Sequence, residues 1–248
     1  MSGLPYGGSV ESLPSLRMTA NLNAVAAGLL DLGAAAAAVQ AGDVAHHVLD
    51  PESVLDLDPL SATELGVALA ALAAVEPGGW ALGLPTPGSL PPLRGPRHLN
   101  EAALQAGQVV LARSGGVALV PLRVGRAVQW RLYPAERPLA PASPYEAERA
   151  LNEAVLGAGA TLTKLEVAAG RRPADSAHVR LAPGYSSRQV ATANRSLYLM
   201  AACDAALSDD GASVSSFEAE TRSRTLRALR AAASQALCAA CSWLEPPS

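Results

Sequence analysis

The sequence predicts an α+β protein. An N-terminal mixed domain, residues 1–137, is expected to carry a small antiparallel β-meander, and residues 143–248 a three-helix antiparallel bundle. Three observations lead to this class. Strand-like runs with turn signals precede residue 137, and helix-capping motifs coincide with apolar periodicity after residue 143. The stretch from Pro134 to Pro144, which contains four prolines, separates the two regions.

Composition supports a globular protein with a sizeable core. The 248 residues are 50% hydrophobic and carry a net charge of −3. The chain has 52 alanines, 18 arginines, one lysine and no isoleucine, a bias that indicates a GC-rich coding sequence, which we expect to be bacterial. Three cysteines do not make a disulfide framework, so we expect a cytoplasmic protein.

The first predicted elements are helical. The apolar stretch from Ala20 to Ala41 contains two asparagines, an aspartate and a glutamine, so it predicts a soluble helix and neither a membrane span nor a signal peptide. Ser61 and Glu64 match a capping box, which predicts a helix starting there. Its core-facing residues are expected to be Leu65, Leu69, Leu72 and Val75.

The meander is predicted from three runs, residues 108–113, 117–124 and 127–133, preceded by a short strand at 80–84 and a short helix at 100–106. Even positions in the last two runs are apolar, so we expect one buried face and one solvated face. The residues expected on the solvated face are Arg123, Gln129, Arg131 and Tyr133.

Three capping patterns predict the three C-terminal helices. They are Ser143 with Glu146, Ser186 with Gln189, and Ser215 with Glu218. Each is followed by apolar residues at helical spacing, and loops between such helices favour antiparallel neighbours.

No catalytic constellation, metal site or cofactor motif is predicted. Cys238 and Cys241 have CxxC spacing but lie inside an apolar helix, so we interpret them as core residues. Adjacent side chains on a strand point to opposite faces, so His46 and His47 are not expected to converge on a metal. His178 is interpreted as an exposed loop residue.

Charge lies in blocks along the chain. Residues 1–93 contain nine acidic residues and one arginine, residues 94–137 seven arginines and two acidic residues, and residues 171–195 five arginines and one aspartate. Because arginines near a helix N-terminus can hold an anion, the last block predicts a phosphate or carboxylate site. Its candidate residues are Arg171, Arg172, Arg180, Ser186 and Arg188. The alternative is that acidic residues 43–76 pair with these arginines, within the chain or between copies.

These observations predict a protein without catalytic activity that acts through protein–protein contacts of its helical bundle and self-associates. The alternative is an enzyme or small-anion sensor with a site at the domain interface near the Arg171–Arg188 loop. Membrane and nucleic-acid partners are not expected. Arg222 and Arg224 each follow a glutamate by four residues, the spacing of intrahelical ion pairs and not of a nucleic-acid surface.

Limited proteolysis tests the predicted domain boundary. We expect the first cleavage between Pro134 and Pro144, because a proline-rich connection exposes its backbone to protease. Mass spectrometry of the earliest fragments locates the cut. A first cut inside one of the three C-terminal helices would contradict the division.

Overall fold

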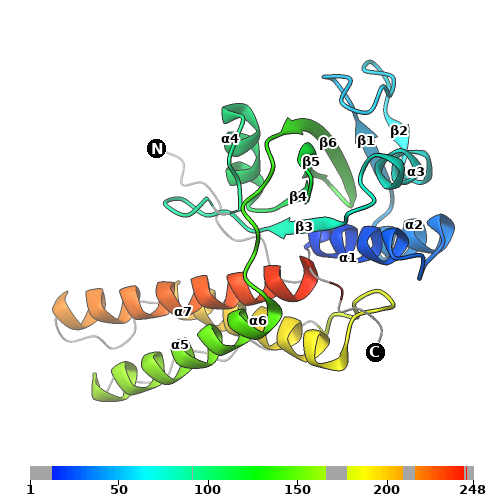
Figure 1. The fold of residues 1–248 in the computed structure, drawn as a ribbon. Helices are drawn as coiled ribbons and strands as arrows, with labels where there is room; N and C mark the ends of the chain where they lie inside the picture. The colour runs from blue at the N-terminus through cyan, green and yellow to red at the C-terminus, as the bar shows by residue number, and fades with distance from the viewer. Residues whose placement is uncertain (1–12, 91, 166–177, 209–215, 243, 245–248) are drawn as a thin grey trace. The chain divides into compact units, whose positions relative to one another are not determined.

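The predicted α+β class is confirmed by a computed structural model, which describes residues 13–90, 92–165, 178–208, 216–242 and 244 (Figure 1). The chain divides into two compact units. The sheet unit comprises Leu13–Pro141, Leu181–Ser186 and the residues from Cys241 on, and the helical unit comprises Ala142–Arg180 and Ser187–Ala240.

The sheet has six strands in the order β2-β1-β6-β5-β4-β3. Their bounds are β1 His46–Leu49, β2 Thr63–Glu64, β3 Trp80–Gly83, β4 Val109–Ala112, β5 Gly116–Val124 and β6 Ala127–Ala135. The predicted meander of β4, β5 and β6 is confirmed, with antiparallel pairing throughout. The strands β1 and β2 were not predicted, and β1 runs parallel to β6. The sheet is therefore mixed.

Four helices belong to the sheet unit: α1 Pro14–Ala26, α2 Leu32–Gln40, α3 Leu65–Val75 and α4 Arg97–Ala106. The prediction of one helix over residues 20–41 was wrong, because the chain turns between α1 and α2. Gly28 has a φ of +70°, which favours glycine. The Asp31 side chain then caps a new helix by accepting a hydrogen bond from Ala34 N at 2.8 Å.

The predicted helix start at Ser61 was also wrong. Thr63 and Glu64 pair with Val48 and His47 of β1, so the chain is extended at these positions and α3 begins at Leu65. Glu64 itself occupies the N-cap position. Pairing with a neighbouring strand has overridden a local capping pattern.

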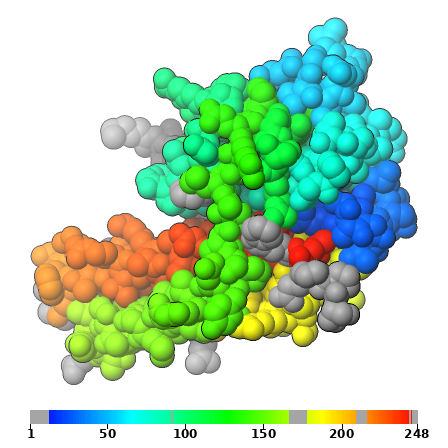
Figure 2. Space-filling view, in the orientation of Figure 1, coloured from blue at the N-terminus to red at the C-terminus, as the bar shows by residue number. Residues whose placement is uncertain are grey.

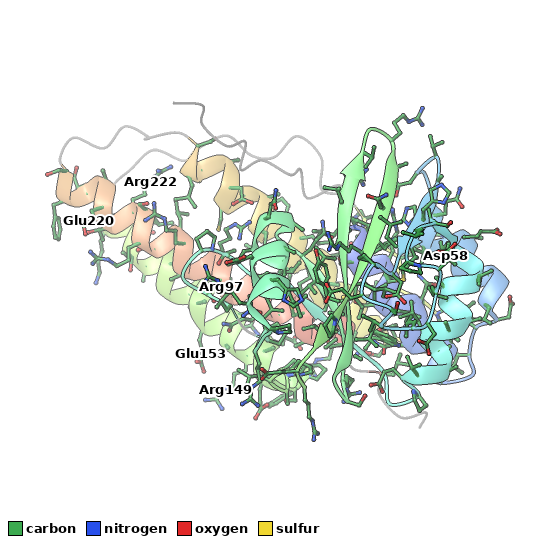
Figure 3. All side chains as sticks on the ribbon, turned by 90° about the horizontal axis from the view of Figure 1, so that it is seen from above. Asp58, Arg97, Arg149, Glu153, Glu220 and Arg222 are labelled. Carbon is green, nitrogen blue, oxygen red and sulfur yellow. The ribbon has the colours of Figure 1, made fainter. Side chains whose placement is uncertain are left out.

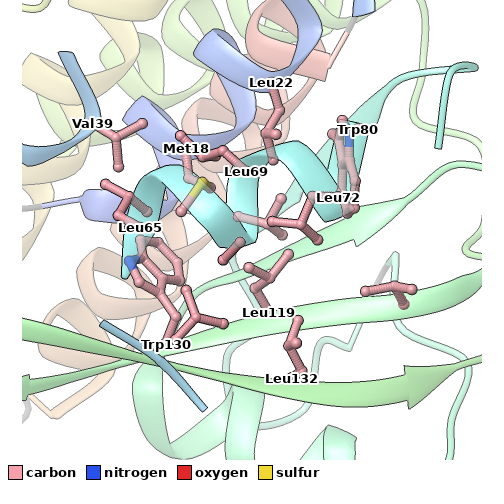
Figure 4. Close-up of a cluster of buried hydrophobic side chains, with 14 of the residues drawn as sticks. Met18, Leu22, Val39, Leu65, Leu69, Leu72, Trp80, Leu119, Trp130 and Leu132 are labelled. Carbon is pink, nitrogen blue, oxygen red and sulfur yellow. The ribbon is translucent and has the colours of Figure 1, made fainter. Parts of the chain in front are cut away.

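Both faces of the sheet are covered in its central part. One cluster joins α1, α2 and α3 to β6 and to the odd positions of β5; in Figure 4, Leu65, Leu69 and Leu72 of α3 lie over these strands. A second cluster on the opposite face includes Leu99 and Ala103 of α4 with Ala118, Val120 and Tyr133.

The predicted faces of the meander were right for the buried even positions of β6 and for exposed Arg123 and Arg131, but wrong in assigning the same parity to both strands. Leu119 of β5 pairs with Leu132 of β6, so odd positions of one strand share a face with even positions of the other. Tyr133, expected to be exposed, is buried, whereas Leu122 and Val124, expected to be buried, are each 56% exposed.

The helical unit consists of α5 Pro144–Lys164, α6 Ser187–Leu207 and the residues of α7 up to Ala240, where α7 spans Ser216–Ser242. The capping box of Ser143 and Glu146 is confirmed, with the Ser143 side chain accepting from Glu146 N and the Glu146 carboxylate accepting from Ser143 N. Ser215 lies outside the described residues. The Gln189 side chain donates to the carbonyl oxygen of Ala240 on α7.

The directions of the three helices follow from their contacts. Pairs between α6 and α7 join early residues of one helix to late residues of the other, so these two helices run antiparallel as predicted. Between α5 and α6, Arg188 pairs with Glu148 and Arg195 with Asn152, so these helices point the same way, and the predicted antiparallel arrangement was wrong for this pair.

The outer edge of β3 is closed by side chains and not by another strand. The Asn23 side chain accepts a hydrogen bond from Trp80 N at 2.7 Å and donates to Trp80 O at 3.0 Å. Its amide nitrogen also lies 3.1 Å from the Tyr185 hydroxyl and 3.1 Å from the Cys241 carbonyl oxygen. The Ser242 hydroxyl accepts from Leu82 N at 2.9 Å. The Asn23 amide thus satisfies both backbone groups of Trp80, and the Ser242 hydroxyl satisfies the N–H of Leu82.

Replacing this amide should destabilise the protein strongly. We expect Asn23→Ala to lower the free energy of unfolding by about 2–4 kcal/mol, because it leaves the buried N–H and C=O of Trp80 without partners. Urea denaturation followed by circular dichroism measures the change. Asn152→Ala, which removes an exposed contact with Arg195, is the matched control and should cost less than about 1 kcal/mol. Equal losses in the two variants would contradict the role of Asn23.

Candidate functional site

The outward faces of α2 and α3 form an apolar surface, here called the α2–α3 face. The two helices contact each other within the sheet unit, and their surfaces meet at the right of Figure 2, in blue and cyan. Of their 9 and 11 residues, Gln40 has the only polar side chain. A helix that is apolar on all sides is usually buried against protein or lipid on all sides. These two are not.

Exposure of the α2–α3 face follows helical spacing. On α3, Val67 is 56% and Val75 is 50% exposed, and Ala70 and Ala74 between them are also exposed. Val75 was predicted to lie in the core, and this was wrong, because it is the last residue of α3 and the chain leaves the helix there. On α2 the exposed residues are Gly33, Ala34, Ala37 and Gln40.

The alanine-rich composition does not explain this face. Exposed helices elsewhere in the same chain carry ion pairs at i,i+4 spacing: Arg149 with Glu153 on α5 and Glu220 with Arg224 on α7. Figure 3 labels Arg149 and Glu153 along α5 and Glu220 on α7. The absence of charge is therefore local to α2 and α3 among these helices.

Carboxylates stand at the N-termini of α2 and α3 and in the loop before β2. Asp31 occupies the N-cap of α2, Glu64 occupies the N-cap of α3, and both are exposed. Asp58 is exposed in the loop that leads to β2, beside Leu60, which is 94% exposed. Hydrogen bonds from Leu60 N and then from Ser61 lower the pKa of Asp58, so this carboxylate stays charged.

A polar network lies at the C-terminal end of α2. The His46 ring is buried, its Nε2 lies 3.0 Å from the Asp43 carboxylate, and its Nδ1 accepts from Trp130 Nε1 at 3.1 Å. An acceptor Nδ1 requires the proton on Nε2, which therefore donates to Asp43. Asp43 also forms ion pairs with Arg17 of α1 and Arg123 of β5. Both ring nitrogens are occupied, so His46 holds the fold and has no free lone pair for acid–base catalysis.

Burial lowers the pKa of His46, and together with the charges of Arg17 and Arg123 it outweighs the hydrogen bond and charge of Asp43, which raise the pKa. For Asp43, burial raises the pKa, but the hydrogen bond from His46 and the charges of Arg17 and Arg123 together bring it below its ordinary value. At neutral pH the network therefore combines a neutral imidazole with an ionised carboxylate.

Two further buried carboxylates hold loops. Asp50 accepts from Val54 N at 2.7 Å, from Leu55 N at 2.8 Å and from Leu57 N at 3.3 Å. Glu76 accepts from Gly78 N at 2.7 Å and from Ser114 N at 2.8 Å. Both carboxylates therefore hold the conformation of the loops whose backbone N–H groups donate to them.

The predicted anion site is described only in part. Arg171 and Arg172 lie outside the described residues, Arg180 is exposed and Ser186 is half-buried. Arg188 forms an ion pair with Glu148 at 2.6 Å and lies over the Tyr145 ring at 5.6 Å. Its guanidinium group is thus engaged with a carboxylate of the chain itself.

The other candidate residues have structural surroundings. His46 is buried and His47 is exposed on the opposite side of β1, as predicted. Cys241 is buried and Cys238 is half-buried. His178 is exposed, whereas Asp175 lies outside the described residues. Among the described residues, no group of three or more His, Cys, Asp or Glu side chains is placed to hold a metal ion.

The arginines of α7 make contacts inside the helical unit. Arg224 pairs with Glu220, Arg230 pairs with Asp204 of α6, and Arg222 donates to the carbonyl oxygen of Ala206. Arg222 is buried. These contacts hold α7 against α6.

Sequence reasoning missed the α2–α3 face. The inward residues of α3 predict the core, and the outward residues of the same helix were not predicted to form a surface. The signal was present, since residues 65–75 contain no polar side chain.

The His46 network predicts a specific pH dependence of stability. Because the pKa of His46 is lower in the folded protein than its ordinary value of 6.5, the unfolded chain binds the proton more readily. Stability should therefore fall as the pH drops below about 6.5. His46→Gln keeps an acceptor for Trp130 and a donor for Asp43 but does not titrate, so its stability should fall less between pH 7 and pH 5. Urea unfolding at several pH values measures this.

His47→Gln is the control, since it removes an exposed histidine from the same strand. Its pH dependence should resemble that of the parent protein. If His46→Gln follows the parent curve as well, the network does not determine the dependence.

Two family models match the chain. The model for the Rv1486c-like protein, N-terminal domain, matches residues 15–150, and the model for the Rv1486c-like protein, C-terminal domain, matches residues 145–238. Comparison with curated proteins and with solved structures gave no match. In the described residues, no helix is long and apolar enough to cross a membrane. The first model alone covers more than half of the 248 residues, so the chain belongs to the family of Rv1486c-like proteins.

Proposed function

We propose that this protein acts through protein–protein contacts, and that the α2–α3 face docks a helical segment of a partner chain. The observation that carries the proposal is the exposure of two neighbouring helices that share a single polar side chain, Gln40. Contiguous exposed apolar surface commonly marks an interaction site. Two packed helices present ridges and grooves that accept the apolar face of a third helix.

The contacts of the buried titratable groups support binding over catalysis. His46, Asp43, Asp50 and Glu76 are engaged with side-chain or backbone partners that hold elements together. Such groups are poorly placed to exchange protons with a substrate. The alternative site near Arg188 is disfavoured by its ion pair with Glu148, which an anion would have to break.

The sequence favoured the helical bundle as the interaction surface, whereas the surface proposed here is the α2–α3 face. Exposed faces of α5 and α7 carry ion pairs, whereas the α2–α3 face carries none. Burying the exposed half of Val67 or Val75 contributes on the order of 1 kcal/mol each. The surrounding alanines let a partner helix approach closely.

Loss of the two valines should weaken docking without unfolding the protein. The probe is a fluorescent amphipathic peptide of about 18 residues, five helical turns, with leucine on one face and glutamine on the other. We expect Val67→Gln/Val75→Gln to raise its dissociation constant about thirtyfold, because roughly 2 kcal/mol of apolar burial is lost. Fluorescence anisotropy measures binding, and circular dichroism checks the fold; glutamine favours helix at least as well as valine.

Leu156→Gln/Phe217→Gln is the matched control. It removes two hydrophobic side chains that are 74% and 73% exposed on α5 and α7. We expect it to leave peptide binding unchanged. Equal weakening in both variants, or no binding to the parent protein, would contradict the α2–α3 face as the docking surface.

Self-association is a second part of the proposal. Opposite charge blocks along the chain, with residues 1–93 acidic and residues 94–137 basic, favour contacts between copies. Sedimentation velocity over about a hundredfold range of concentration measures it, since mass action populates a dimer as concentration rises. A constant monomeric coefficient would contradict this part and leave docking on the α2–α3 face unaffected.

A further inference from the structure

We infer that the segment which docks on the α2–α3 face is a basic amphipathic helix. The inference rests on the proposed function and names the chemistry of its partner. Three observations support it: the exposed carboxylates near the α2–α3 face, the small number of positive side chains that pair with them, and the repulsion that they would exert on an acidic partner.

The chain segment that contains α2 and α3 is rich in acidic residues, although Arg126 lies next to it, where its carbonyl oxygen accepts from Val44 N, and His47 of β1 is paired with Glu64 of β2. Residues 18–93 contain eight aspartates and glutamates and no lysine or arginine. Three of these carboxylates, Asp43, Asp50 and Glu76, are engaged in the contacts described above. The other five are exposed: Asp31, Glu52, Asp56, Asp58 and Glu64.

Few positive charges are available to neutralise the exposed carboxylates. Glu52 lies 3.4 Å from His98 of α4. Arg17 and Arg123 are both directed to Asp43. Within the described residues, Asp31, Asp56, Asp58 and Glu64 form no ion pair with an arginine or a lysine. Their charge remains open to a partner.

Two of these carboxylates lie at the ends of the helices that form the apolar surface. Asp31 and Glu64 directly precede the first residues of α2 and α3. Asp58 lies six residues before Glu64, in the loop that carries the exposed Leu60. A helix of 11 residues is only about 16 Å long. At physiological salt the interaction between exposed charges decays over about 8 Å. The carboxylates at the helix ends therefore still attract a positively charged partner bound to the α2–α3 face.

The same charges exclude two other occupants. A second copy would present the same exposed carboxylates beside its own α2–α3 face, and like charges at an interface oppose association. An anionic lipid surface is repelled for the same reason, since helices that lie on such membranes carry lysine and arginine. A helix with leucine on one face and lysine or arginine on its flanks fits both the apolar surface and its acidic ends.

Three peptides of identical leucine face test the inference. Their other positions are all lysine, all glutamine or all glutamate. At low salt we expect the lysine peptide to bind the full-length protein about tenfold more tightly than the glutamine peptide, and the glutamate peptide to bind most weakly. The difference should shrink as salt is raised, because exposed charges are screened.

A charge-neutralising variant locates the effect. Asp31→Asn/Asp58→Asn/Glu64→Gln removes three charges, and asparagine at position 31 preserves a side-chain oxygen for the cap of α2. We expect this variant to bind the lysine peptide about tenfold more weakly and the glutamine peptide unchanged. The matched control, Glu101→Gln/Glu153→Gln/Glu220→Gln, changes the net charge equally on α4, α5 and α7 and should leave both affinities unchanged.

The outcomes separate the inference from the proposed function. Equal affinity for all three peptides overturns the basic partner and leaves helix docking intact. Binding of none overturns both. Equal weakening by the control variant shows a general charge effect and overturns the role of the acidic ends. Binding to vesicles that contain phosphatidylserine, as tight as to the lysine peptide, identifies a membrane surface and overturns the inference as well.

Discussion

The edge of the sheet at β3 is closed by buried side chains, with the Asn23 amide bound to Trp80 and the Ser242 hydroxyl bound to Leu82. An edge strand leaves N–H and C=O groups that need partners once they are buried, and each unmet group is costly. Asn23 supplies both an acceptor and a donor to Trp80, as a neighbouring strand would. Because Asn23 comes from α1, this pairing fixes that helix against the sheet and positions the layer formed by α1, α2 and α3. Tyr185 and Cys241, distant in sequence, meet the same amide.

The His46 network acts at the other end of this layer. It joins β1 to β6 through Trp130, to α1 through Arg17 and to β5 through Arg123, with Asp43 at its centre. Burial of a neutral imidazole and an ionised carboxylate is tolerated because each polar atom of the ring has a partner. The chain after α2 is thereby tied to the sheet, and α2 is held beside α3 with its apolar side outward.

The same helices thus supply both the buried residues that fix them to the sheet and the exposed apolar residues proposed to bind a partner. α3 packs Leu65, Leu69 and Leu72 inward and leaves Val67 and Val75 outward. A helix surface that is fixed by its buried face can bind a partner without first becoming ordered, which lowers the entropy cost of association. The carboxylates at the helix ends add specificity to this surface, because they attract positively charged partners and repel negatively charged ones.

The sequence by itself determined the class, the meander and the capped start of α5, because these depend on local signals: alternation, turn residues and the Ser143–Glu146 pair. It also determined that adjacent His46 and His47 diverge. The tertiary structure decided what depends on pairing over long distances. Residues 63–64 became a strand because β1 was beside them, and the register of Leu119 with Leu132 decided which faces of β5 and β6 are buried. Exposure of Val67 and the partners of Asp43 likewise arise only when helices far apart in sequence pack together, since burial is a property of the assembled layers.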